Sequence, residues 1–69
     1  MREFTLFGLD ECARLLSTER VTLPDEDAAR ATARERLLRF SRVEVWDGAI
    51  CICRTSRETH GAAVQRRPA

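Results

Sequence analysis

Four side chains of this 69-residue sequence could together hold a metal ion: Cys12, Cys51, Cys53 and His60. Three thiolates and one imidazole are a common ligand set for structural zinc, and a chain this short gains stability from a bound metal. The spacing argues against such a site. Cys-x-Cys on a strand separates the two Cα atoms by about 6.5–7 Å, whereas structural zinc sites use Cys-x₂₋₄-Cys in a turn. We therefore expect no metal and no other cofactor, and three reduced thiols that pack as small hydrophobic side chains.

The sequence offers equally little for catalysis. It contains no Cys-x-x-Cys redox pair, no glycine-rich phosphate loop and no serine nucleophile motif. His60 is the only histidine, and it could activate a cysteine only if the C-terminal segment folded back. The acidic residues 25–27 are explained by their place at the start of a predicted helix. We expect a protein that is not an enzyme and has no small-molecule substrate.

The helix that must organise the fold is predicted over residues 25–40. Asp25 is a good N-cap, and Pro24 stands just outside the helix. Small apolar residues near the start of the helix should allow it to lie flat across one face of a sheet. Its apolar stripe consists of Ala29, Ala33, Leu37 and Phe40.

A β-hairpin is predicted after this helix, because Asp47-Gly48 separates two alternating apolar runs and suits a type I′ turn. In that register one face carries four β-branched side chains toward the helix: Val43, Val45, Ile50 and Ile52. The other face carries Trp46, Ala49, Cys51 and Cys53, with Arg42 and Glu44 at its rim. A slip of one residue would exchange the two faces.

The first strand is predicted over residues 2–8, where Phe4 and Leu6 alternate with Thr5 and Phe7. This alternation is typical of a half-buried strand with one face toward a core.

The segment that follows the first strand allows two interpretations. Residues 9–16 could form about two helical turns, or the chain could return as a second strand over roughly residues 13–23. We favour the strand, because Val21 and Leu23 alternate with polar neighbours. Pro24 also pushes the residue before it toward the β region.

Together these elements predict the α+β class, in the order β-β-α-β-β. We expect a two-layer domain over residues 1–55, with a four-stranded, mainly antiparallel sheet and one helix on one face. Residues 56–69 are predicted to be a weakly structured tail. The resulting domain is small, since chains of this size bury only about 60% of the surface that they expose when unfolded.

The segments VTLPDEDAARATARERL and VEVWDGAICICR resemble a family of small uncharacterised bacterial proteins of unknown function. Members of that family begin with an aromatic-rich strand, continue with a V-x-L-P-D-x-x-A-A-R helix entry and end in a hairpin. The resemblance covers roughly residues 3–55. It implies the fold and assigns no catalytic residue. This chain departs from the pattern at residues 10–20 and in its two cysteines in the last strand.

Charge is unevenly distributed, although the net charge is only +1. Residues 1–27 hold three Arg against seven acids, and residues 28–69 hold nine Arg against four acids. A dedicated nucleic-acid-binding protein is usually more basic, so we interpret the helix arginines as a solvated face. The candidate contacts for nucleic acid or an acidic partner are Arg30, Arg34, Arg54 and Arg57.

The function class that remains is protein interaction, because a single helix can cover only one face of the sheet. We expect a homodimer formed by the other face, through Phe7, Trp46, Ala49, Cys51, Cys53 and Arg42. The alternative is a small regulator or inhibitor of a nucleic-acid-handling complex, in the manner of anti-CRISPR proteins. No apolar run is long enough to span a membrane, and the N-terminus lacks the features of a signal peptide, so we expect a cytoplasmic protein.

Overall fold

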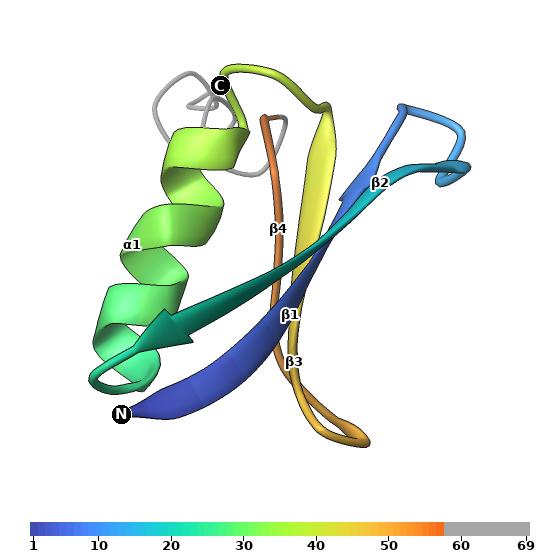
Figure 1. The fold of residues 1–69 in the computed structure, drawn as a ribbon. Helices are drawn as coiled ribbons and strands as arrows, with labels where there is room; N and C mark the ends of the chain where they lie inside the picture. The colour runs from blue at the N-terminus through green and yellow to red at the C-terminus, as the bar shows by residue number, and fades with distance from the viewer. Residues whose placement is uncertain (58–69) are drawn as a thin grey trace, which may run out of the picture.

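The computed structural model describes residues 1–57 and contains four strands and one helix in the predicted order β-β-α-β-β (Figure 1). The strands are β1 (Arg2–Leu9), β2 (Leu15–Leu23), β3 (Arg42–Asp47) and β4 (Ile50–Ser56), and the helix is α1 (Glu26–Arg36). The predicted α+β class is therefore confirmed. The alternative of a helix near residues 9–16 is wrong, because this segment forms a turn and the beginning of β2.

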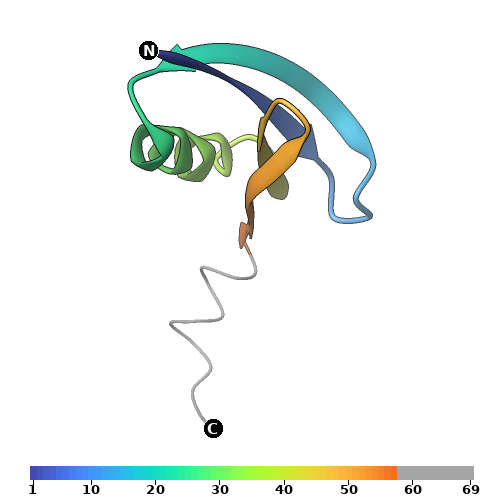
Figure 2. The same cartoon turned by 90° about the horizontal axis from the view of Figure 1, so that it is seen from below.

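All four strands form one antiparallel sheet in the order β2-β1-β3-β4. The chain leaves the outer strand β2, passes through α1 and returns as β3 on the far side of β1. α1 lies along one side of the twisted sheet (Figure 2) and contacts all four strands. We call the sheet side that packs against α1 the helix face, and the opposite side the open face.

α1 begins where the sequence predicts. The Asp25 carboxylate accepts a hydrogen bond from the Ala28 backbone N–H at 2.8 Å, which satisfies one of the free donors of the first turn. The regular helix ends at Arg36, earlier than the predicted end at Phe40. Residues 37–39 continue as tighter turns in which the Leu37 and Leu38 N–H groups bond carbonyls three residues back.

The core lies between α1 and the helix face. Ala29 and Ala33 are fully buried and lie close to the sheet because their side chains are small. The predicted stripe is therefore confirmed, and Phe40 also packs against the core from beyond the helix end. The sheet contributes the large buried side chains Phe4, Leu6, Val43 and Val45.

The turn of the β3–β4 hairpin is not the predicted Asp47-Gly48 pair. Asp47 instead pairs with Ile50, and the loop residues are Gly48 and Ala49. Gly48 has φ +61, and Ala13 is the only other residue of the described part with positive φ. Positive φ at the first loop residue alone fits a type II′ turn rather than type I′.

A bulge at Ile52 then reverses the faces predicted for the residues of β4 that follow it. Trp46 pairs with Cys51 and Val45 with Cys53, so Ile52 is an extra residue on β4. Cys53 therefore packs against the core on the helix face, and its predicted place beside Trp46 is wrong. Ile50, predicted to be in the core, is 67% exposed, whereas Ile52 packs against the core as predicted.

β4 extends through Ser56, one residue beyond the predicted domain boundary. Arg57 then fixes the end of this strand: its backbone N–H bonds the Ser41 carbonyl at 3.0 Å, and its Nε donates to the Leu37 carbonyl at 2.6 Å. The rest of the predicted tail, with His60, lies outside the described residues. Within residues 1–57, no helix is long and apolar enough to cross a membrane.

Candidate functional site

The open face brings together side chains from all four strands. Cross-strand pairing places Thr5 beside Trp46 and Phe7 beside Glu44, and these rows continue outward to the edge strands. Polar and aromatic residues alternate across the face, in contrast to the wholly apolar helix-side core. Its members include Thr18 and Arg20 of β2, Thr5 and Phe7 of β1, Arg42, Glu44 and Trp46 of β3, and Cys51 and Arg54 of β4.

Trp46 is held in one orientation on this face. The Trp46 and Phe7 rings pack edge to face, with their centroids 6.3 Å apart and an interplanar angle of 82°. The indole Nε1 donates a hydrogen bond to Glu44 Oε1 at 3.0 Å. Glu44 in turn lies 3.6 Å from the Arg54 guanidinium. Trp46 is half-buried. Because its ring packs against Phe7 and its Nε1 bonds Glu44, the side chain already has a fixed orientation in the monomer.

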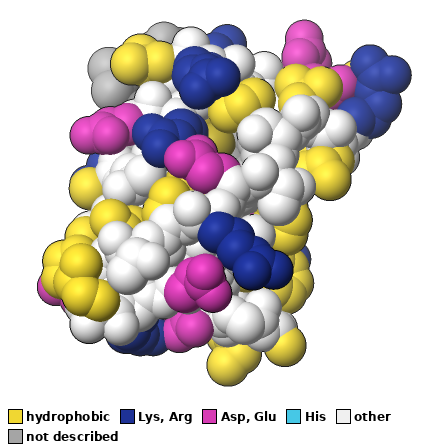
Figure 3. Space-filling model, viewed as in Figure 1, with side chains coloured by type: hydrophobic (Ala, Val, Ile, Leu, Met, Phe, Trp, Pro, Cys, Tyr) yellow, Lys and Arg dark blue, Asp and Glu magenta, His cyan; other side chains and the backbone are white. Residues whose placement is uncertain are grey.

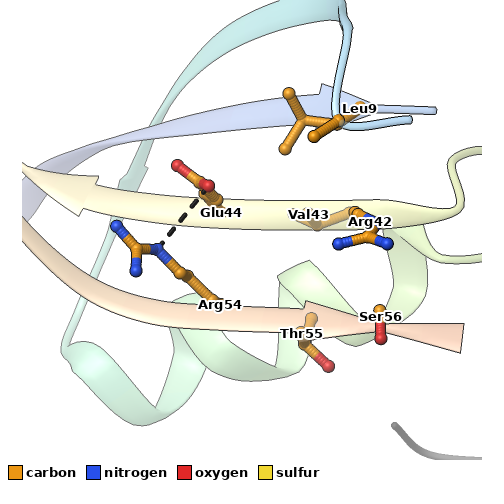
Figure 4. A pocket seen from close by; sticks show the side chains of 8 residues that line it. Leu9, Arg42, Val43, Glu44, Arg54, Thr55 and Ser56 are labelled. Carbon is orange, nitrogen blue, oxygen red and sulfur yellow. Dashed lines mark ion pairs between the residues drawn. The ribbon is translucent and has the colours of Figure 1, made fainter. Parts of the chain in front are cut away.

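A pocket of about 200 Å³ opens beside this group, toward the end of the sheet where β3 begins. Leu9 lies on one side of it, and Glu44 and Arg54 form their ion pair on the other (Figure 4). Arg42 and Val43 contribute further walls from β3. The pocket thus combines an apolar lining with two guanidinium groups and one carboxylate. Its remaining lining residues are Ala13, Thr55 and Ser56.

The β1–β2 turn supplies one wall of this pocket and is ordered by Asp10. The Asp10 carboxylate accepts hydrogen bonds from the backbone N–H groups of Cys12 and Arg14, both at 2.9 Å, and from Arg14 Nε at 2.9 Å. These bonds, first among them that of the Arg14 N–H, hold the pKa of Asp10 below its ordinary value. The turn accommodates Ala13 at φ 65, and Ala13 lines the pocket.

Arg42 joins this turn to the sheet. Its Nη2 donates to the Glu11 carbonyl at 3.2 Å, and the neighbouring Ser41 hydroxyl donates to the Glu11 carboxylate at 3.4 Å. The Arg42 side chain is half-buried. Its guanidinium is therefore fixed at the pocket wall rather than extended into solvent.

The predicted partner-binding residues are thus only partly gathered. Phe7, Trp46, Cys51 and Arg42 share the open face. Ala49 lies in the hairpin turn. Cys53 lies on the opposite face because of the bulge described above.

The predicted basic residues are distributed over separate parts of the surface. Arg30 pairs with Glu26 at 3.5 Å and Asp27 at 3.6 Å, and Arg54 pairs with Glu44. Arg34 and Arg57 are brought near one another, in a groove of about 520 Å³ that they line with Leu37 and Leu38. On the side seen in Figure 3, acidic and basic side chains lie beside one another with hydrophobic ones scattered between them. This side presents no extended surface of positive charge.

The structure does not bring the cysteines together. Cys12 is exposed in the β1–β2 turn, Cys51 lies on the open face and Cys53 on the helix face. Among residues 1–57 no group of three His, Cys, Asp or Glu side chains is arranged to hold a metal ion. His60, the fourth candidate ligand, lies outside the described residues.

Sequence reasoning missed the pocket beside Arg42. Its walls come from Leu9, Ala13 and both strands of the second hairpin, so no local run of residues signals it. The one usable signal was Asp10, whose side chain can bond backbone N–H groups two residues on and so order a turn.

No family model, curated protein or solved structure matches this chain. The resemblance to a family of uncharacterised bacterial proteins therefore stays a prediction.

Proposed function

We propose that this protein is a small, non-enzymatic interaction module that forms a homodimer through its open face. The observation that carries the proposal is the placement of Trp46. It stands on the sheet face opposite the described helix, fixed by Phe7 and Glu44. Tryptophan is over-represented among residues that dominate binding energy, and a side chain already fixed in place loses less entropy on binding.

The mixed character of the open face supports a second copy as the partner. Acidic and basic side chains are both present on it, with Glu44 between Trp46 and Arg54. In a two-fold dimer the same surface is used by both copies, so it must offer both signs of charge to be self-complementary. Burial against a second copy would also supplement the limited core of so short a chain.

The small area of the open face indicates a weak interface. Four strands about 4.8 Å apart and about 20 Å long give roughly 400 Å² for each copy. Stable interfaces bury about 800 Å² for each partner. We therefore expect a weak dimer whose population depends on protein concentration.

Light scattering coupled to size-exclusion chromatography tests the proposal on the full chain. The wild type should move from monomer toward dimer as concentration rises from about 10 µM to 1 mM, around the range expected for a weak interface. Trp46→Arg should stay monomeric while its circular dichroism remains that of the wild type. Leu38→Arg is the matched control, because Leu38 is 86% exposed at the helix end and lies off the open face. A wild type that is monomeric throughout, or a Trp46→Arg variant that dimerises normally, would overturn the proposal.

The alternative, a regulator acting on a nucleic-acid-handling complex, has less support. Arg30 and Arg54 pair with acids of the same chain, and Arg57 donates to the Leu37 carbonyl just beyond the end of α1. Binding to duplex or single-stranded DNA that falls steeply with salt would favour this alternative over self-association.

We also propose that the protein is cytoplasmic. Cys12, Cys51 and Cys53 are free thiols in the structure, and thiols stay reduced in that compartment.

A further inference from the structure

Arg42 is a half-buried cation without a matching acid in the described chain. Its Nη2 donates to the Glu11 carbonyl at 3.2 Å, and no ion pair joins it to any carboxylate of residues 1–57. Arg54, on the next strand, has Glu44 at 3.6 Å. A guanidinium carries five N–H donors and binds carboxylates with two of them in parallel. The Arg42 donors that bond no residue of 1–57 therefore suit a further carboxylate.

The pocket beside Arg42 has room for such a group. Its volume of about 200 Å³ is well above the roughly 30 Å³ that one water molecule occupies in the liquid. The apolar side chains of Leu9 and Ala13 suit the methylene groups of an acidic side chain, and Arg42 suits its carboxylate. Water is partly displaced from such a pocket, which strengthens the attraction between the two charges.

The open face carries an acid of the required kind at its other end. Glu3 is exposed and pairs across the strands with exposed Thr22, so it lies on the open face, and no ion pair joins it to another described residue. Leu9, six residues further along β1, pairs with Arg42. Glu3 and Arg42 are thus separated by about 20 Å along the strand direction.

We infer that the Arg42 pocket receives the Glu3 carboxylate of a second copy. A two-fold axis that crosses the strands near the middle of the open face reverses the strand direction between copies. It therefore brings the Glu3 end of each copy over the Arg42 end of the other. The rows between these ends carry Trp46 and Phe7, so the aromatic pair falls at the centre of the interface. This inference rests on the proposed homodimer and adds its orientation and its two ion pairs.

A charge swap tests the inference on the full chain. Glu3→Arg and Arg42→Glu should each raise the dimer dissociation constant about tenfold or more, as expected for the loss of a close interfacial charge pair. The double variant carries the pair reversed and should return to within about threefold of the wild type, because the coupling is then restored. Dissociation constants come from sedimentation equilibrium, with circular dichroism as the check on folding.

Two further variants keep the test decisive. Glu35→Arg makes the same charge reversal on α1, off the open face, and should leave the dissociation constant unchanged. Arg42→Gln removes the charge but retains a donor for the Glu11 carbonyl, so it replaces Arg42→Glu if that variant fails to fold. Arg42→Gln should then weaken the dimer and make it insensitive to Glu3→Gln.

The outcomes separate this inference from the proposed function. A dimer that Trp46→Arg disrupts but that Glu3→Arg and Arg42→Glu leave intact would overturn only the inference. Single variants that weaken the dimer without recovery in the double variant would overturn it as well. A wild type that is monomeric at every concentration would remove both proposals.

Discussion

The Phe40 ring lies directly on Gly8 of β1, so that a methyl group added at Gly8 would stand 2.6 Å from the ring. The contact closes the core beyond the end of α1, where the chain turns toward β3. No side chain larger than hydrogen fits between the strand and the ring without displacing one of them.

Gly8→Ala is therefore expected to lower the free energy of unfolding by about 1–3 kcal/mol, the usual cost of an overpacked core. Urea denaturation followed by circular dichroism measures the change. In a Phe40→Ala background the same substitution should cost much less, because the ring is gone. Equal costs in the two backgrounds would show that Gly8 acts through its backbone and not through the contact with Phe40.

The N-cap of α1 offers a second test of how local sequence sets the fold. Asp25→Ala removes the acceptor of the Ala28 N–H bond at 2.8 Å and should cost about 1 kcal/mol of stability. Asp25→Asn is the matched control, since asparagine caps about as well as aspartate. Thermal unfolding of the three proteins should give nearly equal midpoints for wild type and Asp25→Asn. A midpoint for Asp25→Ala equal to these two would contradict the capping role.

The elements that local chemistry determines were predictable from the sequence. Pro24 and Asp25 correctly predict where the helix begins. The spacing of Ala29, Ala33 and Leu37 correctly predicts its buried side. The hairpin register was not predictable in this way. Both possible turns contain Gly48, and the observed register includes a bulge at Ile52 that lets both Ile52 and Cys53 pack against the core.

The same limit applies to the candidate site. Strand alternation alone placed Phe7 and Trp46 on one face, and the structure agrees. The Arg42 pocket was not foreseen, because Arg42 bonds Glu11, 31 residues earlier in the sequence. Contacts between residues so far apart depend on how the elements pack, and no local pattern encodes them.

The ion pair between β2 and α1 should make stability depend on pH. Arg36 donates to both carboxylate oxygens of Glu19, at 3.0 and 2.9 Å, and these bonds hold the pKa of Glu19 below its ordinary value of 4.5. A carboxyl whose pKa is lowered by folding stabilises the fold above its ordinary pKa. That contribution is lost as the pH falls below 4.5 and through the folded pKa.

Glu19→Gln should therefore be less stable than wild type at pH 7, and the difference should shrink as the pH falls below about 4.5. The two side chains are 41% and 26% exposed, so solvent screening keeps the difference at pH 7 below about 1 kcal/mol. Urea denaturation at pH 7, 5 and 3 measures it. Some acid sensitivity should persist in the variant, because folding also lowers the pKa of Asp10. A wild type and variant that differ equally at all three pH values would contradict the prediction.

The register of the second hairpin can be tested with two isoleucines of β4. Ile50 is 67% exposed and Ile52 packs against the core, although a hairpin with an Asp47-Gly48 turn would bury both. Ile50→Ala should change the free energy of unfolding by less than about 0.5 kcal/mol, as for other surface sites. Ile52→Ala should cost about 1–2 kcal/mol, below the 2–5 kcal/mol typical of a fully buried isoleucine because Ile52 is only half-buried. Each variant serves as the control for the other, since the substitution is chemically identical. Similar losses for both would favour the regular hairpin without a bulge, which in turn would return Cys53 to the open face.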